Sequence, residues 1–261
     1  EQHRGADSGH LLGLGQADLR LEAAEQVASE ITAGGGKAIA LACNVLERSS
    51  LEEAKAKVAA EFGPVDILVN GAGGNHPKGT TSREHLLPAD IDSAPDDVVT
   101  FFDLEKEGID FVFNLNFMGT LLPCQGFTRG MAERGRGTII NISSMNAFTP
   151  LTKIPAYSGA KAAVSNFTQW LAVHMSKVGI RVNAIAPGFF LTDQNRSLLT
   201  NEDGSPTARG GQIIGQTPLG RYGTPEELVG TLLWLVSDKA AGFVTGTVIP
   251  VDGGFSAFSG V

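Results

Sequence analysis

Short runs of apolar, largely β-branched residues alternate along this chain with longer segments that have the apolar spacing of helices. The runs are continuous, which is typical of strands buried on both faces of a parallel sheet. This order predicts βαβ units, and therefore an α/β fold with a doubly wound parallel sheet. The expected strands are residues 37–45, 65–73, 137–144, 180–188 and 246–254, and the expected helices are 51–63, 156–179 and 224–238.

No linker rich in Pro, Gly or Ser and no run of charge divides the 261 residues, so we expect a single domain. Ligands of doubly wound sheets bind beyond the carboxyl ends of the strands. Four groups of residues lie at those ends and are expected to converge on one crevice: Asn44, residues 70–74, Ser143–Ser144 and Pro187–Gly188.

Tyr157 and Lys161 are four residues apart in the expected helix 156–179, so they share one of its faces. Lowering the pKa of a phenol from about 10 by ~3 units takes roughly 4 kcal/mol. A cation about 4 Å away supplies that much at an effective dielectric of about 20, so Lys161 is expected to lower the pKa of Tyr157. Ser144 could then bond a substrate oxygen while Tyr157 exchanges its proton, with the hydride coming from a cofactor. A tyrosine–lysine pair alone is more often a surface pair, but the strand-end serine favours catalysis.

Composition argues against several other functions. The net charge of −8 and the pI of about 5.1 do not suit a broad basic face for nucleic acid. Cys43 and Cys124 form no CxxC pattern, which fits a reducing cytoplasm without structural disulfides, and the five histidines form no metal-binding pattern. No apolar run approaches the ~20 residues that span a bilayer, and no signal peptide is visible. We therefore expect a cytoplasmic protein without a metal, a membrane or a nucleic acid as partner.

From about Gly5 to the C-terminus, the sequence resembles the short-chain dehydrogenase/reductase family, whose fold is Rossmann-like. The matching parts are VNGAGG at 69–74, Asn116 in NLNFMGT, Ser144, Tyr157 with Lys161, APG at 186–188 with Thr192, and VDGG at 251–254. The resemblance implies an oxidoreductase that uses NAD or NADP. Its implied catalytic residues are Asn116, Ser144, Tyr157 and Lys161, with Asn116 helping to hold a water and the lysine.

The resemblance also implies the residues that contact the cofactor. Tyr157 and Lys161 would do so, with Lys161 bonding the nicotinamide ribose. The other implied contacts are Asn44 and Val45 at the adenine, Asn70, Ala72 and Gly73 beneath the ribose, and Ile185, Pro187, Gly188 and Thr192 at the nicotinamide.

Segments 71–81, 116–127 and 186–199 resemble more narrowly the bacterial D-mannonate oxidoreductases of that family, also called D-fructuronate reductases. Those enzymes interconvert a keto-hexuronate and an aldonate. An acidic protein needs local cations and donors to hold a carboxylate, and Lys78 and Lys153 are near the expected crevice. The residues expected to bind the substrate are Asn75, His76, Ser144, Gln194, Asn195 and Arg196.

Each substrate-binding expectation has an ordinary structural alternative. His76 with Pro77 could only shape a turn, and residues 194–196 could be solvated helix surface. Residues 190–215 are expected to form a substrate lid, and the long insertion 76–111 could cover the site.

One part of the family pattern cannot be found, namely the TGxxxGxG turn that follows the first strand and holds the pyrophosphate. Residues 9–16 resemble the second strand, so we interpret Gly13 and Gly15 as strand end. The domain 1–261 is therefore expected to be N-terminally incomplete, without the first strand and its Gly-rich loop. A truncated gene, a segment outside the given sequence and a degenerate relative all fit.

The same region bears on the choice between NAD and NADP. An acid at the end of the second strand favours NAD, and a nearby arginine favours NADP. Gly15–Gln16 offers neither, and Asp18 is interpreted as lying too far along the chain. NAD is only weakly preferred.

The expected function is the NAD(P)-dependent interconversion of a keto-hexuronate and an aldonate, with Tyr157 as the acid and base. Alternatives are another sugar or polyol dehydrogenase of the same family and a catalytically inactive, truncated relative. Family members are usually tetramers or dimers, so a homotetramer or homodimer is expected.

Overall fold

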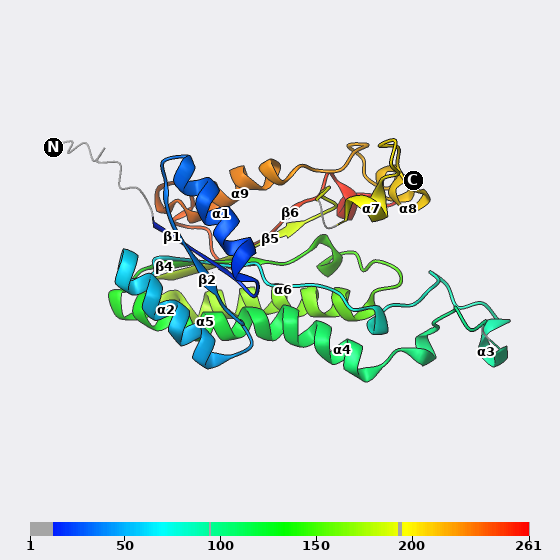
Figure 1. The fold of residues 1–261 in the computed structure, drawn as a ribbon, viewed down its shortest axis with the longest axis horizontal. Coiled ribbons are helices and arrows are strands. Elements are labelled where there is room, and N and C mark those ends of the chain that lie inside the picture. The colour runs from blue at the N-terminus through cyan, green and yellow to red at the C-terminus, as the bar shows by residue number, and fades with distance from the viewer. Residues whose placement is uncertain (1–12, 94, 193–194, 261) are drawn as a thin grey trace. The chain divides into compact units, whose positions relative to one another are not determined.

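The computed structural model describes residues 13–93, 95–192 and 195–260. The chain divides at Val65 into two compact units, and each is described by itself. Figure 1 shows the ribbon coloured along the chain.

The N-terminal unit is a parallel strand pair with two helices. Strand β1 (Gly13–Asp18) pairs in parallel with β2 (Lys37–Ala42), and helices α1 (Leu21–Ala33) and α2 (Arg48–Phe62) pack against them. A Cβ at Gly13 would lie 2.2 Å from the Phe62 ring of α2, and a Cβ at Gly15 would lie 2.6 Å from Val58. These glycines therefore let a helix approach the strand. They belong to a strand, as predicted, and not to a phosphate-binding turn.

Strand β1 extends two residues beyond Gln16 and ends at Asp18. The interpretation that Asp18 lies too far along was therefore wrong. The acid stands at the carboxyl end of the strand, where its carboxylate accepts a 2.8 Å hydrogen bond from the backbone N–H of Arg20.

The C-terminal unit contains a four-stranded sheet in the order β3 (Ile67–Asn70), β4 (Gly137–Ile142), β5 (Ile180–Pro187) and β6 (Val248–Val251). All three pairings are parallel, which confirms the predicted α/β class with parallel sheets. The strands end one to three residues earlier than the apolar runs do, because the runs continue into the loops at the carboxyl edge.

Helices cover both faces of this sheet, as a doubly wound, Rossmann-like fold requires. Helices α5 (Gly119–Arg134) and α6 (Pro155–Met175) pack on one face, and α9 (Val229–Val236) packs on the other (Figure 1). The core beneath α9 includes Ile140 of β4, Ile185 of β5 and Leu235.

The segments between these elements contain shorter helices: α3 (Asp90–Ser93), α4 (Lys106–Phe113), α7 (Arg196–Leu199), α8 (Ala208–Gly215) and α10 (Asp238–Ala241). The helix predicted over 224–238 begins with a capping box between Thr224 and Glu227 and a 3₁₀ turn. It stops at Val236 because Ser237 caps α10 instead. None of the helices in the described ranges is long and apolar enough to cross a membrane.

Strand pairing leaves a break between the two sheets. In Rossmann-type order, the first strand lies between the second and the fourth, to which β1 and β3 correspond. Within the described residues, β1 pairs only with β2, and β3 pairs only with β4. The expectation that a strand and its Gly-rich loop are missing from this position stays a prediction.

Candidate active site

Helix α6 carries the predicted pair Tyr157 and Lys161. Pro155 occupies its first position, so the tyrosine stands in the first turn and the lysine one turn later. Lys161 is 3% exposed, and its Nζ donates a 2.9 Å hydrogen bond to the carbonyl oxygen of Ile142, the last residue of β4. The same nitrogen lies 5.6 Å from the centre of the Tyr157 ring. The bond to the strand end holds the lysine beside the tyrosine.

Ser144 follows β4 by two residues and completes the predicted set. Its side chain is buried and forms a hydrogen bond with that of Tyr157. Its Oγ also accepts from the backbone N–H of Asn146 at 3.2 Å, which begins a 3₁₀ turn. The structure thus brings Ser144, Tyr157 and Lys161 together.

The charge state of this group differs from the expectation. Burial raises the pKa of Tyr157, and its hydrogen bond to Ser144 only partly opposes that change. Burial also lowers the pKa of Lys161 to about 8. The expected lowering of the Tyr157 pKa by Lys161 was therefore wrong for this arrangement. The Lys161 ammonium bonds the Ile142 carbonyl and not the phenol. The loss of hydration on burial therefore has the largest effect on the pKa of Tyr157.

Asn116 lies in a π-helical turn, Asn114–Met118, between α4 and α5. Its buried Nδ2 donates 2.7 Å hydrogen bonds to the carbonyl oxygens of Gly74 and Val112, and its Oδ1 accepts from the Gly74 N–H at 3.3 Å. π-Helical turns inside helices occur frequently at functional sites. Here the turn aims one amide at the loop that follows β3 and fixes that loop.

Asn70 is the last residue of β3, and its side chain is engaged in the interior. Its Nδ2 donates to Asn141 Oδ1 at 2.9 Å and to the Cys124 sulfur at 3.2 Å. Asn141 in turn donates to Thr168 of α6. This chain of amides links β3, β4 and α6 beneath the site. Because the Asn70 side chain is engaged there, only its backbone is left to contact a cofactor, and that contact stays a prediction.

Comparison with known proteins identifies the family. Residues 13–256 match a family model described as enoyl-(acyl carrier protein) reductase. The chain belongs to the short-chain dehydrogenase/reductase family.

Within the described residues, no group of three or more His, Cys, Asp or Glu side chains could hold a metal ion.

Three relatives of this dehydrogenase/reductase carry more specific information. A candidate D-mannonate oxidoreductase from Haemophilus influenzae, solved with bound NAD, is 56% identical, with a TM-score of 0.88 over 95% of this chain and 87% of its own. The uncharacterised oxidoreductase UxuB of Bacillus subtilis is 51% identical over 92% of this chain and 84% of its own. A gluconate 5-dehydrogenase from Burkholderia cenocepacia, solved with NADP and tartrate, is 29% identical, with a TM-score of 0.75 over 94% and 85% of the two chains.

The short-chain dehydrogenase/reductase family uses NAD(P), and a contact of the loop after β3 with such a cofactor stays a prediction. A Cβ at Gly73 would lie 2.7 Å from Asn116 Oδ1 and 3.1 Å from Lys161 Nζ, so only glycine leaves this space open. At the neighbouring strand end, a Cβ at Gly188 would lie 2.6 Å from Asp252. Ile185 and Pro187 lie in β5, which ends just before Gly188. Ala72 lies in the loop after β3, and Thr192 lies in the loop after β5.

In the N-terminal unit, Asn44 and Val45 lie in the loop that follows β2, and their contact with an adenine stays a prediction. The Asn44 side chain bonds Glu47 and the Leu46 N–H, which shapes the loop. Analysis of the sequence missed Asp18, whose position becomes recognisable only once the true end of β1 is known.

The residues predicted to bind substrate have mixed surroundings. His76 Nδ1 accepts from the Lys78 N–H and caps a 3₁₀ turn, so the turn-shaping alternative describes this nitrogen. Asn195 bonds the backbone of Thr192 and Phe190 and shapes its own loop. Asn75 donates to Thr80, and Arg196 begins α7. Gln194 lies outside the described residues, and substrate contact stays a prediction for all of these.

Proposed function

We propose that this short-chain dehydrogenase/reductase interconverts a keto-hexuronate and an aldonate, of the D-fructuronate and D-mannonate kind, with NAD(P). The observation that carries the proposal is the grouping of Ser144, Tyr157 and Lys161 in a chain 56% identical to a candidate D-mannonate oxidoreductase with bound NAD. The uncharacterised relative UxuB is 51% identical and adds no assigned reaction.

A bound nicotinamide cofactor supplies the hydride in reduction and accepts it in oxidation. Tyr157 gives its phenolic proton to the substrate oxygen in reduction and takes it back in oxidation. Burial keeps the phenol protonated, which suits the acid of the reductive direction. Ser144 is bonded to that phenol and can bond the same oxygen. The Lys161 nitrogen lies 5.6 Å from the centre of the phenol ring and would bond the nicotinamide ribose beside Gly73.

We also propose that the protein prefers NAD to NADP. Asp18 ends β1, the position from which an acid bonds the 2′-hydroxyl of the adenosine ribose in this fold. A carboxylate there repels a 2′-phosphate. Arg20 lies nearby, with its Nε 3.9 Å from the same carboxylate, so its charge is partly matched.

The second candidate function is oxidation of another sugar acid or a polyol. The observation that favours it is the likeness to a gluconate 5-dehydrogenase solved with tartrate. A catalytically inactive relative is the third candidate, and the burial of Ser144 and Lys161 argues against it, because an unused buried lysine would be costly to keep.

The proposal is tested by a substrate panel with the purified chain. D-Fructuronate and D-mannonate would be assayed beside D-fructose, D-mannitol and 5-keto-D-gluconate, with NAD(H) and with NADP(H). We expect kcat/KM for the hexuronate pair to exceed that of the neutral sugars at least about 100-fold, because a carboxylate anchored by charged groups contributes roughly 3 kcal/mol. We also expect a lower KM for NADH than for NADPH. Activity confined to neutral sugars would contradict the proposed substrate class.

We further propose a single dehydrogenase/reductase domain that assembles as a homodimer or homotetramer, with residues 190–215 as the substrate lid. The lid region contains α7 and α8, joined by a turn in which Thr200 and Pro206 form an isolated bridge. Trp170 and Val173 of α6 are 57% and 76% exposed, which gives an apolar surface for a second copy. Light scattering of the purified chain measures its assembly.

A further inference from the structure

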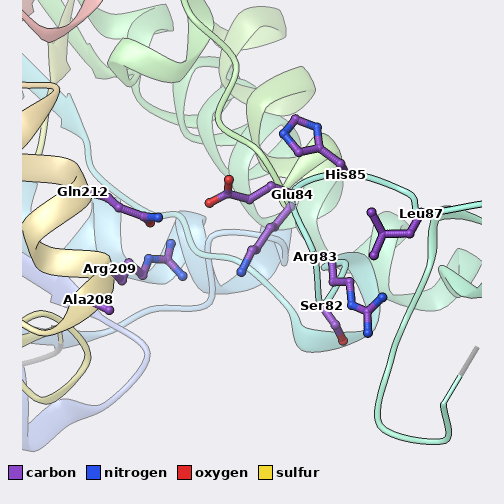
Figure 2. A pocket seen from close by; sticks show the side chains of 9 residues that line it. Ser82, Arg83, Glu84, His85, Leu87, Ala208, Arg209 and Gln212 are labelled. Atoms are coloured by element: carbon purple, nitrogen blue, oxygen red, sulfur yellow. The ribbon is translucent and has the colours of Figure 1, made fainter. Parts of the chain in front are cut away.

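A polar pocket opens between the insertion, the loop before α6 and helix α8. Its volume is about 500 Å³ (Figure 2). Ser82–His85 and Leu87 form one wall, Lys153 another, and Ala208, Arg209 and Gln212 of α8 the third. Lys153 lies two residues before α6 begins and four residues before Tyr157, so the pocket is adjacent along the chain to the catalytic helix.

The charged side chains of this pocket are unequally engaged. Arg83 makes two bonds of 2.7 and 2.8 Å to the buried carboxylate of Asp90, so its charge is matched, and it points away from Arg209 in Figure 2. Lys153 and Arg209 have no side-chain hydrogen bond or ion pair with any described residue. The pocket therefore holds two cations without a described partner against one such carboxylate, that of Glu84, which leaves a net positive charge for an anion.

The pocket also holds groups suited to hydroxyls. Glu84 directs its carboxylate toward Gln212, and the Gln212 amide points back across the space between the two segments (Figure 2). A carboxylate accepts hydrogen bonds from hydroxyl groups, and an amide both donates and accepts them. Two cations beside such a pair match a polyhydroxy carboxylate better than a simple inorganic anion, which has no hydroxyl groups to bond Glu84.

The backbone at Lys153 supports a selected role for its side chain. Its φ of 72° is in the left-handed region. Among the described residues, Lys153 is the one non-glycine residue with a positive φ. Glycine would hold this conformation without strain. Its carbonyl oxygen accepts a 2.9 Å bond from the Thr81 N–H, which ties the loop to the start of the insertion. A strained residue kept beside a catalytic helix points to a function for its side chain.

We infer that Lys153 and Arg209 form the subsite that binds the substrate carboxylate, with Glu84 and Gln212 bonding hydroxyls of the same molecule. This inference rests on the proposed function and names the residues that select an acid over a neutral sugar. The pocket joins the loop before the catalytic helix to α8 of the proposed lid, so a bound acid would contact both segments.

The test compares wild type with Lys153→Gly, Arg209→Met and the control Lys177→Met, which alters an exposed lysine outside the pocket. Lys153→Gly suits the left-handed backbone, so its melting temperature should not fall. For both pocket variants we expect kcat/KM for D-fructuronate to fall roughly 10- to 100-fold, mostly through KM. Turnover of any neutral ketose and binding of NADH should stay within about 3-fold of wild type, as should every reading for Lys177→Met.

Calorimetric titration with D-mannonate in the presence of NADH separates this inference from the proposed function. If wild type turns over no hexuronate, the proposed function fails, but saturable mannonate binding that both pocket variants weaken still supports the subsite. Unchanged kcat/KM in both variants, equal losses on acid and neutral substrates, or mannonate binding that is absent or unaltered would each overturn it.

Discussion

At the scale of single residues, Lys161 is the feature with the clearest physical cost. Its ammonium is buried beneath Tyr157 with one carbonyl partner, and burial lowers its pKa to about 8. The unfolded value is 10.5, so keeping the charged lysine in the folded state costs about 3 kcal/mol below pH 8. The site therefore retains a charge that works against folding.

This cost predicts a pH dependence of stability. Between pH 8 and 10.5, the unfolded chain holds a proton on Lys161 that the folded chain has lost, so the free energy of unfolding should rise with pH in that window. Lys161→Met should abolish this rise and be more stable than wild type at pH 7 by about 1–2 kcal/mol, the lost bond to Ile142 offsetting part of the gain. Urea unfolding at several pH values measures both effects, with Lys177→Met as the control. If the free energy of unfolding of Lys161→Met varied with pH as that of wild type does, the lowered pKa of Lys161 would be contradicted.

Sequence spacing was sufficient to predict that Tyr157, Lys161 and Ser144 meet, because a helical i, i+4 pair and a strand end have fixed geometry. It was not sufficient for the direction of the Tyr157 pKa. That direction depends on how far the phenol is buried and on the partner chosen by Lys161, and neither is encoded by spacing. For the same reason, the pocket around Lys153 and Arg209 was not predicted, since its walls come from three distant segments.

At the scale of elements, the π-helical turn at Asn116 connects the helix layer to the loop that follows β3. A straight helix would aim Asn116 elsewhere, whereas here its amide makes three bonds, two of them to Gly74. The loop that contains Gly73 is held open beside Lys161 as a consequence.

Asn116→Ala should therefore destabilise the protein by about 2–3 kcal/mol, because it removes the bonds of a buried amide to the half-buried backbone of Gly74 and the buried carbonyl of Val112. Chemical denaturation measures the loss. The matched control is Asn201→Ala, which removes an asparagine that bonds Ser205 and Pro206 in an exposed turn and should cost less than about 1 kcal/mol. Equal losses in the two variants would show that the Asn116 amide does not fix the loop.

Two helix starts followed from the sequence to within a residue, those expected at 156 and 224. The structure explains them by Pro155 at the first position of α6 and by the Thr224–Glu227 capping box. Helix α5 did not, because Pro123, Gly126 and Gly130 interrupt its helical pattern, and packing against β3 and β4 overrides them. The end of β1 was placed two residues early because its glycines resemble a turn, while the contacts with α2 that explain them are tertiary.

At the scale of the whole molecule, the parallel sheets and the helices of the C-terminal unit reproduce the predicted α/β fold, and the family match extends across both units. The parallel direction of the strands followed from βαβ logic, whereas their order in the sheet was not predicted. Among the described residues, β1 pairs with β2 and β3 with β4, and the absence of a Gly-rich unit from the fold stays a prediction.

The central claim is that Tyr157 transfers the proton while a bound nicotinamide transfers the hydride. The most direct measurement is the rate of NADH oxidation in the presence of D-fructuronate by wild type and Tyr157→Phe, beside a fluorescence titration of each with NADH. Loss of one hydroxyl should leave NADH affinity and melting temperature nearly unchanged and lower turnover at least about 100-fold. Equal turnover by the two proteins, with NADH bound to both, would contradict the account.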